Sequence, residues 1–435
     1  MHRILAACAA SSALLMLGLG GSGLTAASQI SDAGSLVVPR KGHTATVLND
    51  GRVLIVGGRD AAGNLASAEL FDPTSRSFSW VGAMETARAG HAATLLPDGR
   101  VLVSGGTDAS GALASAEIFD PTAIVSFSAV ATPMGAARSG HTATLLADGR
   151  VLIAGGDAAG TAEWYDSASG AFAGQLIAMS EIRSRHTATA MGDGLVLFAG
   201  GGSNTVEFFD SAAGTFAAWS RPMNEVRIGH SAVANADDTV LMVGGESAGT
   251  IENFDPSATD FTASIAFGAP GSVAQRMAND RVLVLGPSTA GVFDGSNSSW
   301  LALPELEAPA LHRDGQTATE LAGTKEILVV GGADSSDALV GIAATYNPAR
   351  LETDKADYYP EEEVIVTGTG WKANEEVDLF VVDDLGWTYD STVTAGSDGT
   401  FVTNPLFVVL WEHLGVTFDL TGFGVDSGLS ASHTF

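Results

Sequence analysis

The sequence predicts an all-β protein in which a seven-bladed β-propeller is followed by a small β-sandwich. A unit of roughly 45 residues recurs seven times. Each unit consists of short β-branched and apolar runs separated by turn residues. The periodicity of an amphipathic helix never persists between the 53 glycines. Because one four-stranded sheet buries both faces only when neighbours stack on it, a repeat of this length predicts a propeller.

The N-terminus has the layout of a secretory signal. An apolar run over residues 4–19 is followed by small residues that end at Ala27. We therefore expect a signal peptide over residues 1–27 and a protein that is secreted to the extracellular space, the cell surface or the periplasm. Cys8 is the only cysteine, so a chain cleaved after Ala27 has no thiolate ligand or nucleophile.

Charge and hydropathy limit the partners. No later run approaches the roughly 20 apolar residues that a membrane span needs, so we expect no membrane span. The formal net charge of −29 repels nucleic acid, which we exclude as a partner. We expect a monomer.

One marker position, usually histidine, begins the first strand of every unit. It is held by His43, His91, His141, His186, His230, Ser272 and Gln316. In the third unit the strand HTATLL leads into the hairpin turn Asp148-Gly149 and a return strand over 151–154. A glycine pair ends the return strand in six units, where a side chain would block positive φ or close approach of backbone. The sixth unit has Gly286-Pro287 instead.

Two further strands complete each unit. The third strand ends in a turn, as in the run AELFDP over 68–73, and the fourth carries an aromatic residue that we assign to the core between blades. The seventh unit gives no clear fourth strand. The segment 35–38 precedes the first unit, and we predict that it pairs into the last blade and closes the ring.

These features resemble kelch repeats, particularly the bacterial and galactose-oxidase-like form with the wording GHTATLL.DGRVL..GG. The likeness covers about residues 35–350 and implies a seven-bladed kelch propeller. Residues 351–435 have a different wording, with strand-length runs at 364–368, 377–382, 388–394 and 417–420. This tail resembles the immunoglobulin-like modules of secreted bacterial proteins. We interpret its acidic clusters, 361–363 and 383–384, as solvated surface rather than a calcium site.

The resemblance raises the question of copper-radical oxidation. That family needs a tyrosine crosslinked to cysteine, a second tyrosine and two histidines on copper. Cys8 lies in the signal, and the repeated histidines are spread round the ring, whereas metal ligands must converge. We therefore disfavour a copper oxidase and predict no catalytic residue, no metal site and no cofactor. We expect the histidines to be buried and hydrogen-bonded.

An arginine stands three residues before the marker position in six of the seven units. These arginines are Arg40, Arg88, Arg138, Arg183, Arg227 and Arg313. The resemblance to kelch propellers that hold acidic peptides implies a cationic ring at the channel mouth, suited to carboxylates, sulfates or uronic acids.

Pairing with a repeated glutamate is the alternative use of these arginines. The third strands of the first five units carry Glu69, Glu117, Glu163, Glu207 and Glu252, whereas the seventh has Ala344. We favour structural pairing, which leaves Arg313 as the best candidate for ligand contact.

The sequence thus favours a non-catalytic binding protein that recognises a protein or polysaccharide. The alternative is a carbohydrate-active propeller enzyme, because loops rather than repeats carry catalysis in such folds. An enzyme should show irregular, non-repeated polar residues that converge on one face of the molecule.

Overall fold

The computed structural model describes residues 30–435 except 236, 247–248, 259, 263–264, 267–270, 287–289, 296–298, 304–312, 335 and 414. In these residues the regular elements are strands, apart from one 3₁₀ turn at Trp411–His413. The fold is all-β. None of the described helical segments is long and apolar enough to cross a membrane.

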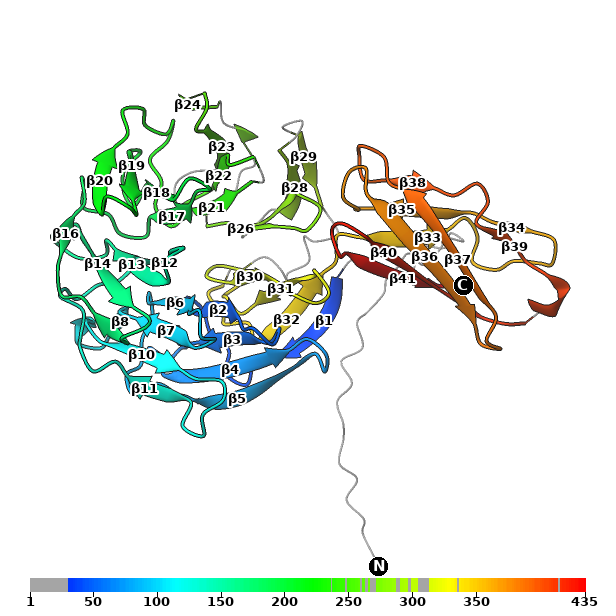
Figure 1. Cartoon of the computed structure of the whole chain (residues 1–435). Coiled ribbons are helices and arrows are strands. Elements are labelled where there is room, and N and C mark those ends of the chain that lie inside the picture. Colours follow the sequence, from blue (N-terminus) through cyan, green and yellow to red (C-terminus); the bar gives the residue numbers. More distant parts are fainter. Residues whose placement is uncertain are drawn as a thin grey trace, which may run out of the picture.

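Seven antiparallel sheets account for the repeats, and in the first six the strands follow chain order from the inner to the outer strand (Figure 1). The first sheet contains β2 (Thr44–Val47), β3 (Val53–Val56), β4 (Ser67–Asp72) and β5 (Ser77–Ala83). The second contains β6 (Ala92–Leu95), β7 (Val101–Ser104), β10 (Ala116–Phe119) and β11 (Phe127–Ala129), beside the small hairpin β8 (Thr107–Asp108) and β9 (Gly111–Ala112). The third contains β12 (Thr142–Leu145), β13 (Arg150–Ala154), β14 (Thr161–Asp166), β15 (Ala171–Phe172) and β16 (Ile177–Ala178).

The remaining four sheets repeat this order. The fourth contains β17 (Thr187–Ala190), β18 (Leu195–Ala199), β19 (Val206–Asp210) and β20 (Thr215–Ala218). The fifth contains β21 (Ser231–Ala234), β22 (Val240–Val243), β23 (Thr250–Asp255), β24 (Asp260–Phe261) and β25 (Ile265–Ala266). The sixth contains β26 (Val273–Arg276), β27 (Val282–Leu285), β28 (Ala290–Asp294) and β29 (Ser299–Ala302). The seventh contains β30 (Thr317–Glu320), β31 (Ile327–Val330), β32 (Ile342–Tyr346) and β1 (Ile30–Ser35).

The seventh sheet takes its outer strand from the N-terminal end of the described chain. β1 pairs antiparallel with β32, with Ile30 opposite Tyr346. A preceding segment therefore completes the last sheet, as the sequence predicts, but the strand lies mostly before residues 35–38. Residues 37 and 38 instead donate their backbone N–H groups to the Glu69 carboxylate at 2.7 and 3.0 Å.

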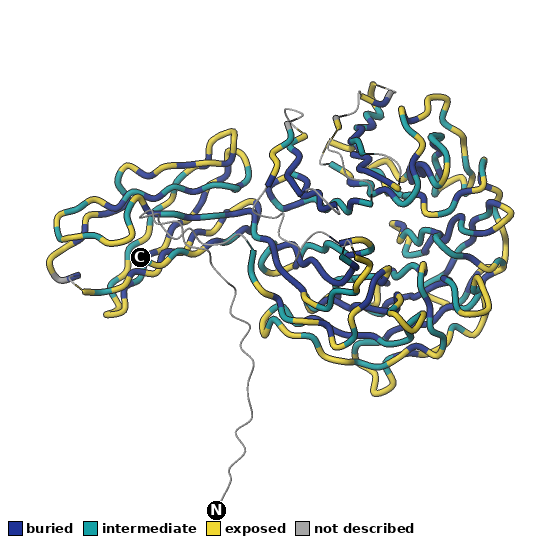
Figure 2. The backbone as a smooth tube through the Cα atoms, turned by 180° about the vertical axis from the view of Figure 1, so that it is seen from behind, coloured by how far each residue is buried: buried dark blue, intermediate teal, exposed yellow. Residues whose placement is uncertain are grey.

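Apolar clusters lie between successive sheets and make the arrangement propeller-like. Between the first two sheets, for example, Leu54 and Leu70 share a cluster with Val103 and Phe119. A further cluster joins the seventh sheet to the first through Leu328 and Phe71. The second strands are buried and almost entirely apolar, so both of their faces contribute to this core, which fits a sheet covered on both sides. Exposed residues gather towards the outer rim of the sheets (Figure 2).

The glycine pairs let successive sheets approach. A Cβ on Gly57 would lie 2.6 Å from His91 Cε1, and one on Gly58 would lie 2.7 Å from the Lys41 carbonyl oxygen. Both glycines have positive φ, at 62° and 86°. The pair is therefore required by backbone conformation and by the close packing of the next repeat.

The C-terminal part forms three further sheets around its own core. One contains β33 (Arg350–Thr353), β35 (Val366–Thr369) and β38 (Phe401–Val402), and a short one pairs β34 (Glu363–Val364) with β39 (Phe407–Val408). The largest runs β37 (Thr388–Thr394), β36 (Glu376–Asp383), β40 (Phe418–Gly424) and β41 (Ser430–Thr434). Inward residues alternate with exposed ones along β36 and β40, and Trp371 lies at the centre of the cluster.

Candidate functional site

The six repeated arginines are buried side chains, each at most 1% exposed. Arg40 Nη2 donates to Glu69 Oε1 at 2.7 Å, and its Nη1 donates to the carbonyl oxygens of Gly57 and Ser67. Ion pairs recur in the next four sheets as Arg88–Glu117 at 2.8 Å, Arg138–Glu163 at 3.2 Å, Arg183–Glu207 at 2.6 Å and Arg227–Glu252 at 2.6 Å. The favoured interpretation, structural pairing, is therefore confirmed in all five sheets that have both residues.

The glutamates also hold the connection between sheets. Glu117 accepts hydrogen bonds from the backbone N–H groups of Glu85 and Thr86 at 2.7 and 3.1 Å. Burial lowers the pKa of Arg88, and its hydrogen bond with Glu117 opposes this effect. Each pair thus joins the entry of a first strand to the third strand of the same sheet, with the charges compensated.

Arg313 lies in the same environment without the repeated glutamate. Its Nη1 donates to the carbonyl oxygens of Gly331 and Ile342 at 3.0 and 2.6 Å. Burial lowers its pKa to about 10. The structure does not display any of the six guanidinium groups to solvent, and their contact with a ligand stays a prediction.

The five marker histidines connect neighbouring sheets. Nε2 of each lies 2.9 to 3.1 Å from a hydroxyl of the preceding sheet, as the pairs His43–Thr317, His91–Thr44, His141–Ser104, His186–Thr142 and His230–Thr187. Burial lowers the pKa of each histidine to about 3, and the nearest arginine adds to this effect. The expectation that they are buried and hydrogen-bonded is confirmed.

A copper centre needs several imidazole, thiolate or similar donors at one point. Each histidine serves a different sheet junction, and no three His, Cys, Asp or Glu side chains come together as a metal site in the part of the chain that the structure describes. Cys8 lies outside the described residues. The described donor set therefore does not fit copper.

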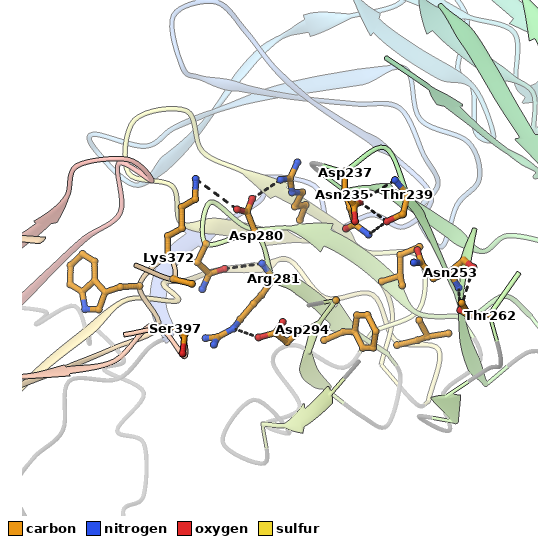
Figure 3. A pocket seen from close by; sticks show the side chains of 18 residues that line it. Asn235, Asp237, Thr239, Asn253, Thr262, Asp280, Arg281, Asp294, Lys372 and Ser397 are labelled. Carbon is orange, nitrogen blue, oxygen red and sulfur yellow. Dashed lines mark hydrogen bonds and ion pairs between the residues drawn. The ribbon is translucent and has the colours of Figure 1, made fainter. Parts of the chain in front are cut away.

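A cleft of about 600 Å³ lies where the fifth and sixth sheets meet the C-terminal part (Figure 3). The β21–β22 turn and β23 form one side, and the β26–β27 turn and the end of β28 form the other. Trp371, Lys372 and Ser397 come from the C-terminal part. Leu241, Ile251 and Phe293 supply apolar surface among otherwise polar side chains.

Asp280 is the most constrained carboxylate of the cleft. It has a φ of 65° at the position where the first four units have the glycine of their hairpin turn, such as Gly149. Its Oδ1 accepts from Arg276 Nη2 at 2.5 Å, and its Oδ2 lies 3.8 Å from Lys372 Nζ. Two cations from different parts of the fold thus face one half-exposed carboxylate.

The second ion pair of the cleft connects the sixth sheet to the C-terminal part. Arg281 Nε donates to Asp294 Oδ2 at 3.1 Å, and Arg281 Nη2 donates to the Asp398 carbonyl oxygen at 2.7 Å. Asn279 Nδ2 donates to the Gly370 carbonyl oxygen at 2.8 Å. These bonds fix one wall of the cleft.

The polar residues of the cleft depart from the repeat. Asn235 stands where the other units have Leu or Met, and Asn253 stands where the first unit has Leu70. Arg276 and Asp280 replace the residues that correspond to Val47 and Gly51. Our sequence reasoning missed this site because it followed what the units share, whereas the signal lies in these departures.

Asn253 has an orphaned acceptor beside this cleft. Its Oδ1 is buried, and no donor among the described residues reaches it. Its backbone N–H donates to Thr262 Oγ1 at 3.3 Å. Buried polar atoms are normally satisfied, so this oxygen is suited to a ligand hydroxyl.

No family model and no curated protein matches the chain. Among solved structures, the chain is similar to a fungal alcohol oxidase of the AA5 family in complex with copper, at a TM-score of 0.60 and 14% identity. The match covers 93% of this chain and 98% of the oxidase. At this identity the likeness shows the fold alone, which is all-β and propeller-like.

This match contradicts our prediction of a non-catalytic binding protein. The neighbour that shares almost the whole fold is an oxidase, and irregular polar residues converge on one cleft, which is the feature that we expect of an enzyme. The alternative, a carbohydrate-active enzyme, agrees better with these findings.

Proposed function

We propose that this protein is an enzyme that acts on carbohydrate and that the cleft at the β26–β27 turn is its active site. The observation that carries the proposal is the convergence there of Asn235, Asn253, Arg276 and Asp280, each of which departs from the repeat. The repeated Arg–Glu and His–hydroxyl networks have a structural role in each unit. These four residues are not repeated, so that structural role does not explain them.

The lining suits a sugar. Amide, carboxylate and cationic groups can exchange hydrogen bonds with hydroxyls, and the apolar surface at Phe293 can pack against the C–H face of a sugar ring. The buried Oδ1 of Asn253 lacks a donor among the described residues, which a sugar hydroxyl would supply.

Asp280 is the residue to which we assign proton abstraction. Arg276 Nη2 and Lys372 Nζ face its carboxylate, and a carboxylate can accept a proton from a sugar hydroxyl or an attacking water. Its exposed oxygen is reachable from solvent, because the side chain is 45% exposed. Arg281 and Asp294 belong to the same wall as Asp280 and position the substrate beside it.

The finer architecture belongs to the same proposal. We infer that the seven sheets close as a seven-bladed kelch propeller over about residues 35–350, supported by inner strands that neighbour one another from β2 to β30 and back to β2. We infer an immunoglobulin-like sandwich for residues 351–435, supported by its alternating strands. The proposed signal peptide, residues 1–27, lies outside the described residues; secretion fits an enzyme on polysaccharide.

The test is an activity screen of the full chain against neutral and acidic polysaccharides, followed by Asp280→Asn. Asparagine tolerates the positive φ of this turn, so we expect an unchanged melting temperature. Because the amide cannot accept the proton, we expect kcat to fall at least 100-fold, in the range that general-base catalysis supplies.

Asp148→Asn is the matched control. Asp148 is 46% exposed and pairs with Arg150 in the hairpin turn of the third sheet, away from the cleft. Its activity should equal that of the wild type. Equal activity of Asp280→Asn, or no turnover of any carbohydrate, would contradict the proposal.

A further inference from the structure

A ring of backbone lies at the entry to the seven first strands. It consists of the residue before each marker position, which is Gly42, Gly90, Gly140, Arg185, Gly229, Gly271 or Gly315. All seven have left-handed φ, between 57° and 77°. Hydrogen bonds link neighbours in the ring, including Arg185 N to the Gly140 oxygen at 2.6 Å and Gly229 N to the Arg185 oxygen at 2.8 Å.

Arg185 is the one side chain that this ring carries. A non-glycine residue at a φ of 57° is strained, because Cβ crowds the backbone in the left-handed region. Six units avoid this strain with glycine. A backbone outlier that the fold itself does not need points to a functional use.

The guanidinium of Arg185 extends along the ring. A Cβ on Gly229 would lie 2.9 Å from Arg185 Nη2, so the side chain crosses the next glycine. Nη2 lies 2.5 Å from Glu246 Oε1, and both side chains are about half exposed, at 49% and 52%. Exposed ion pairs of this kind contribute little to stability, so an incoming carboxylate can displace Glu246.

Two hydroxyl groups lie at other positions of the ring, away from Gly229. A Cβ on Gly90 would lie 2.9 Å from Ser139 Oγ, and one on Gly140 would lie 2.7 Å from Ser184 Oγ, so both hydroxyls lie against the ring. Ser184 Oγ donates to the Ser139 carbonyl oxygen at 3.1 Å. The site beside Gly229 therefore consists of one planar cation and one carboxylate, and the two hydroxyls lie further along the ring.

We propose that Arg185 and Glu246 form a binding site for a uronate sugar. Arg185 takes a carboxylate of the sugar in a bidentate pair, and Glu246 accepts hydrogen bonds from hydroxyls of the same sugar. Each sugar of a uronate chain carries one carboxylate among several hydroxyls, which fits one cation beside one hydrogen-bond acceptor.

This site is separate from the cleft. Arg185 precedes the first strand of its sheet, whereas the cleft is lined by turns that follow first strands, at the opposite end. The proposal does not rest on catalysis in the cleft, because binding at Arg185 is measured without turnover.

The experiment is calorimetric titration of the full chain with trigalacturonate, with its neutral galactose counterpart, and with acetate and sulfate as free oxyanions. We expect trigalacturonate to bind, the neutral sugar not to bind, and the free ions to bind at least tenfold more weakly. Arg185→Gly should weaken trigalacturonate binding at least tenfold and keep or raise the melting temperature, because it relieves the left-handed strain.

The Glu246→Gln variant distinguishes a ligand-binding role of Arg185 from a purely structural ion pair with Glu246. It removes the competing carboxylate but keeps the shape, so we expect trigalacturonate to bind severalfold more tightly. Arg100→Ala is the control, because Arg100 forms a similarly exposed pair with Asp98 at the opposite end of a sheet. Unchanged binding by Arg185→Gly, or wild-type affinity for trigalacturonate no greater than for acetate and sulfate, would overturn the proposal.

Discussion

At the residue scale, the repeated polar side chains are buried and paired. The sequence indicates this for the arginines, because the glutamate of the third strand largely comes and goes with them. It does not indicate which group holds Arg313, because backbone carbonyls have no sequence signature. Repeated sequence patterns thus predict ion pairs between side chains that occur together in the same units. They do not predict hydrogen bonds to backbone carbonyl groups, because every residue has one.

The marker histidines make folding stability depend on pH. Their pKa is about 3 in the folded protein and 6.5 as the ordinary value, so unfolding takes up protons between these limits. The free energy of unfolding should therefore be highest above pH 6.5 and fall as the pH drops towards 3. Each histidine contributes up to about 1.4 kcal/mol per pH unit. Denaturant unfolding at pH 7, 6 and 5 measures the slope.

His141→Gln tests the origin of that slope. Gln316 holds the marker position in the seventh unit and does not titrate, so the substitution has a precedent within the chain. We expect the free energy of unfolding of the variant to depend less steeply on pH than that of the wild type, by the contribution of one histidine. This should hold whatever the stability of the variant at pH 7. Parallel pH profiles for the two proteins would show that another group is responsible.

At the element scale, the second unit supplies the hydroxyl for the contact with the histidine of the next sheet from a different strand. Ala92 stands where the other histidine-linked units have a hydroxyl, and Ser104 faces it across the strand pair. Ser104 Oγ lies 2.9 Å from His141 Nε2. The hydroxyl has moved to the partner strand while the contact is kept, a compensation that is visible in sequence only once the register is known.

Ser104→Ala should remove this buried bond and lower the free energy of unfolding by about 1–3 kcal/mol. The double variant Ala92→Thr/Ser104→Ala returns the hydroxyl to the position of Thr44 and should recover most of the loss. Denaturant unfolding of the three proteins gives both values. If the double variant is no more stable than the single one, the hydroxyl at Ser104 has a different role.

The strand pattern was the most predictable part of the fold. Period-two alternation and turn chemistry placed the strand at 388–394, and the structure has β37 over the same residues. The cleft was not predictable in this way, because its lining comes from two sheets and the C-terminal part, which only the tertiary arrangement brings together. Likewise, nothing local marks residues 30–35 as the partner of β32.

At the scale of the whole molecule, the sixth unit is the base on which the C-terminal part rests. The first three units hold their turn arginine with an aspartate, as Asp50 holds Arg52. The sixth has Asn279, whose amide bonds to Gly370 and leaves Arg281 to reach Asp398. The replacement of the turn aspartate by Asn279 in this unit thus provides the hydrogen bonds to the C-terminal part.

Asn279→Asp restores the ordinary turn and should release the C-terminal part. The new carboxylate would draw Arg281 back, and the bond donated by the Asn279 amide would be lost. We expect calorimetry to show two separate unfolding transitions and small-angle scattering to show a larger radius of gyration. Asp148→Asn, in the turn of the third sheet, should leave both measurements as in the wild type.

The pairing of β1 with β32 also sets an order of assembly. The strand at residues 30–35 is synthesised early, but its partner at residues 342–346 comes only after six sheets have been made. Until then the first sheet lacks its neighbour, and a truncated chain has no means of covering it. The N-terminal strand can therefore take its place in the seventh sheet only after residues 342–346 have been synthesised.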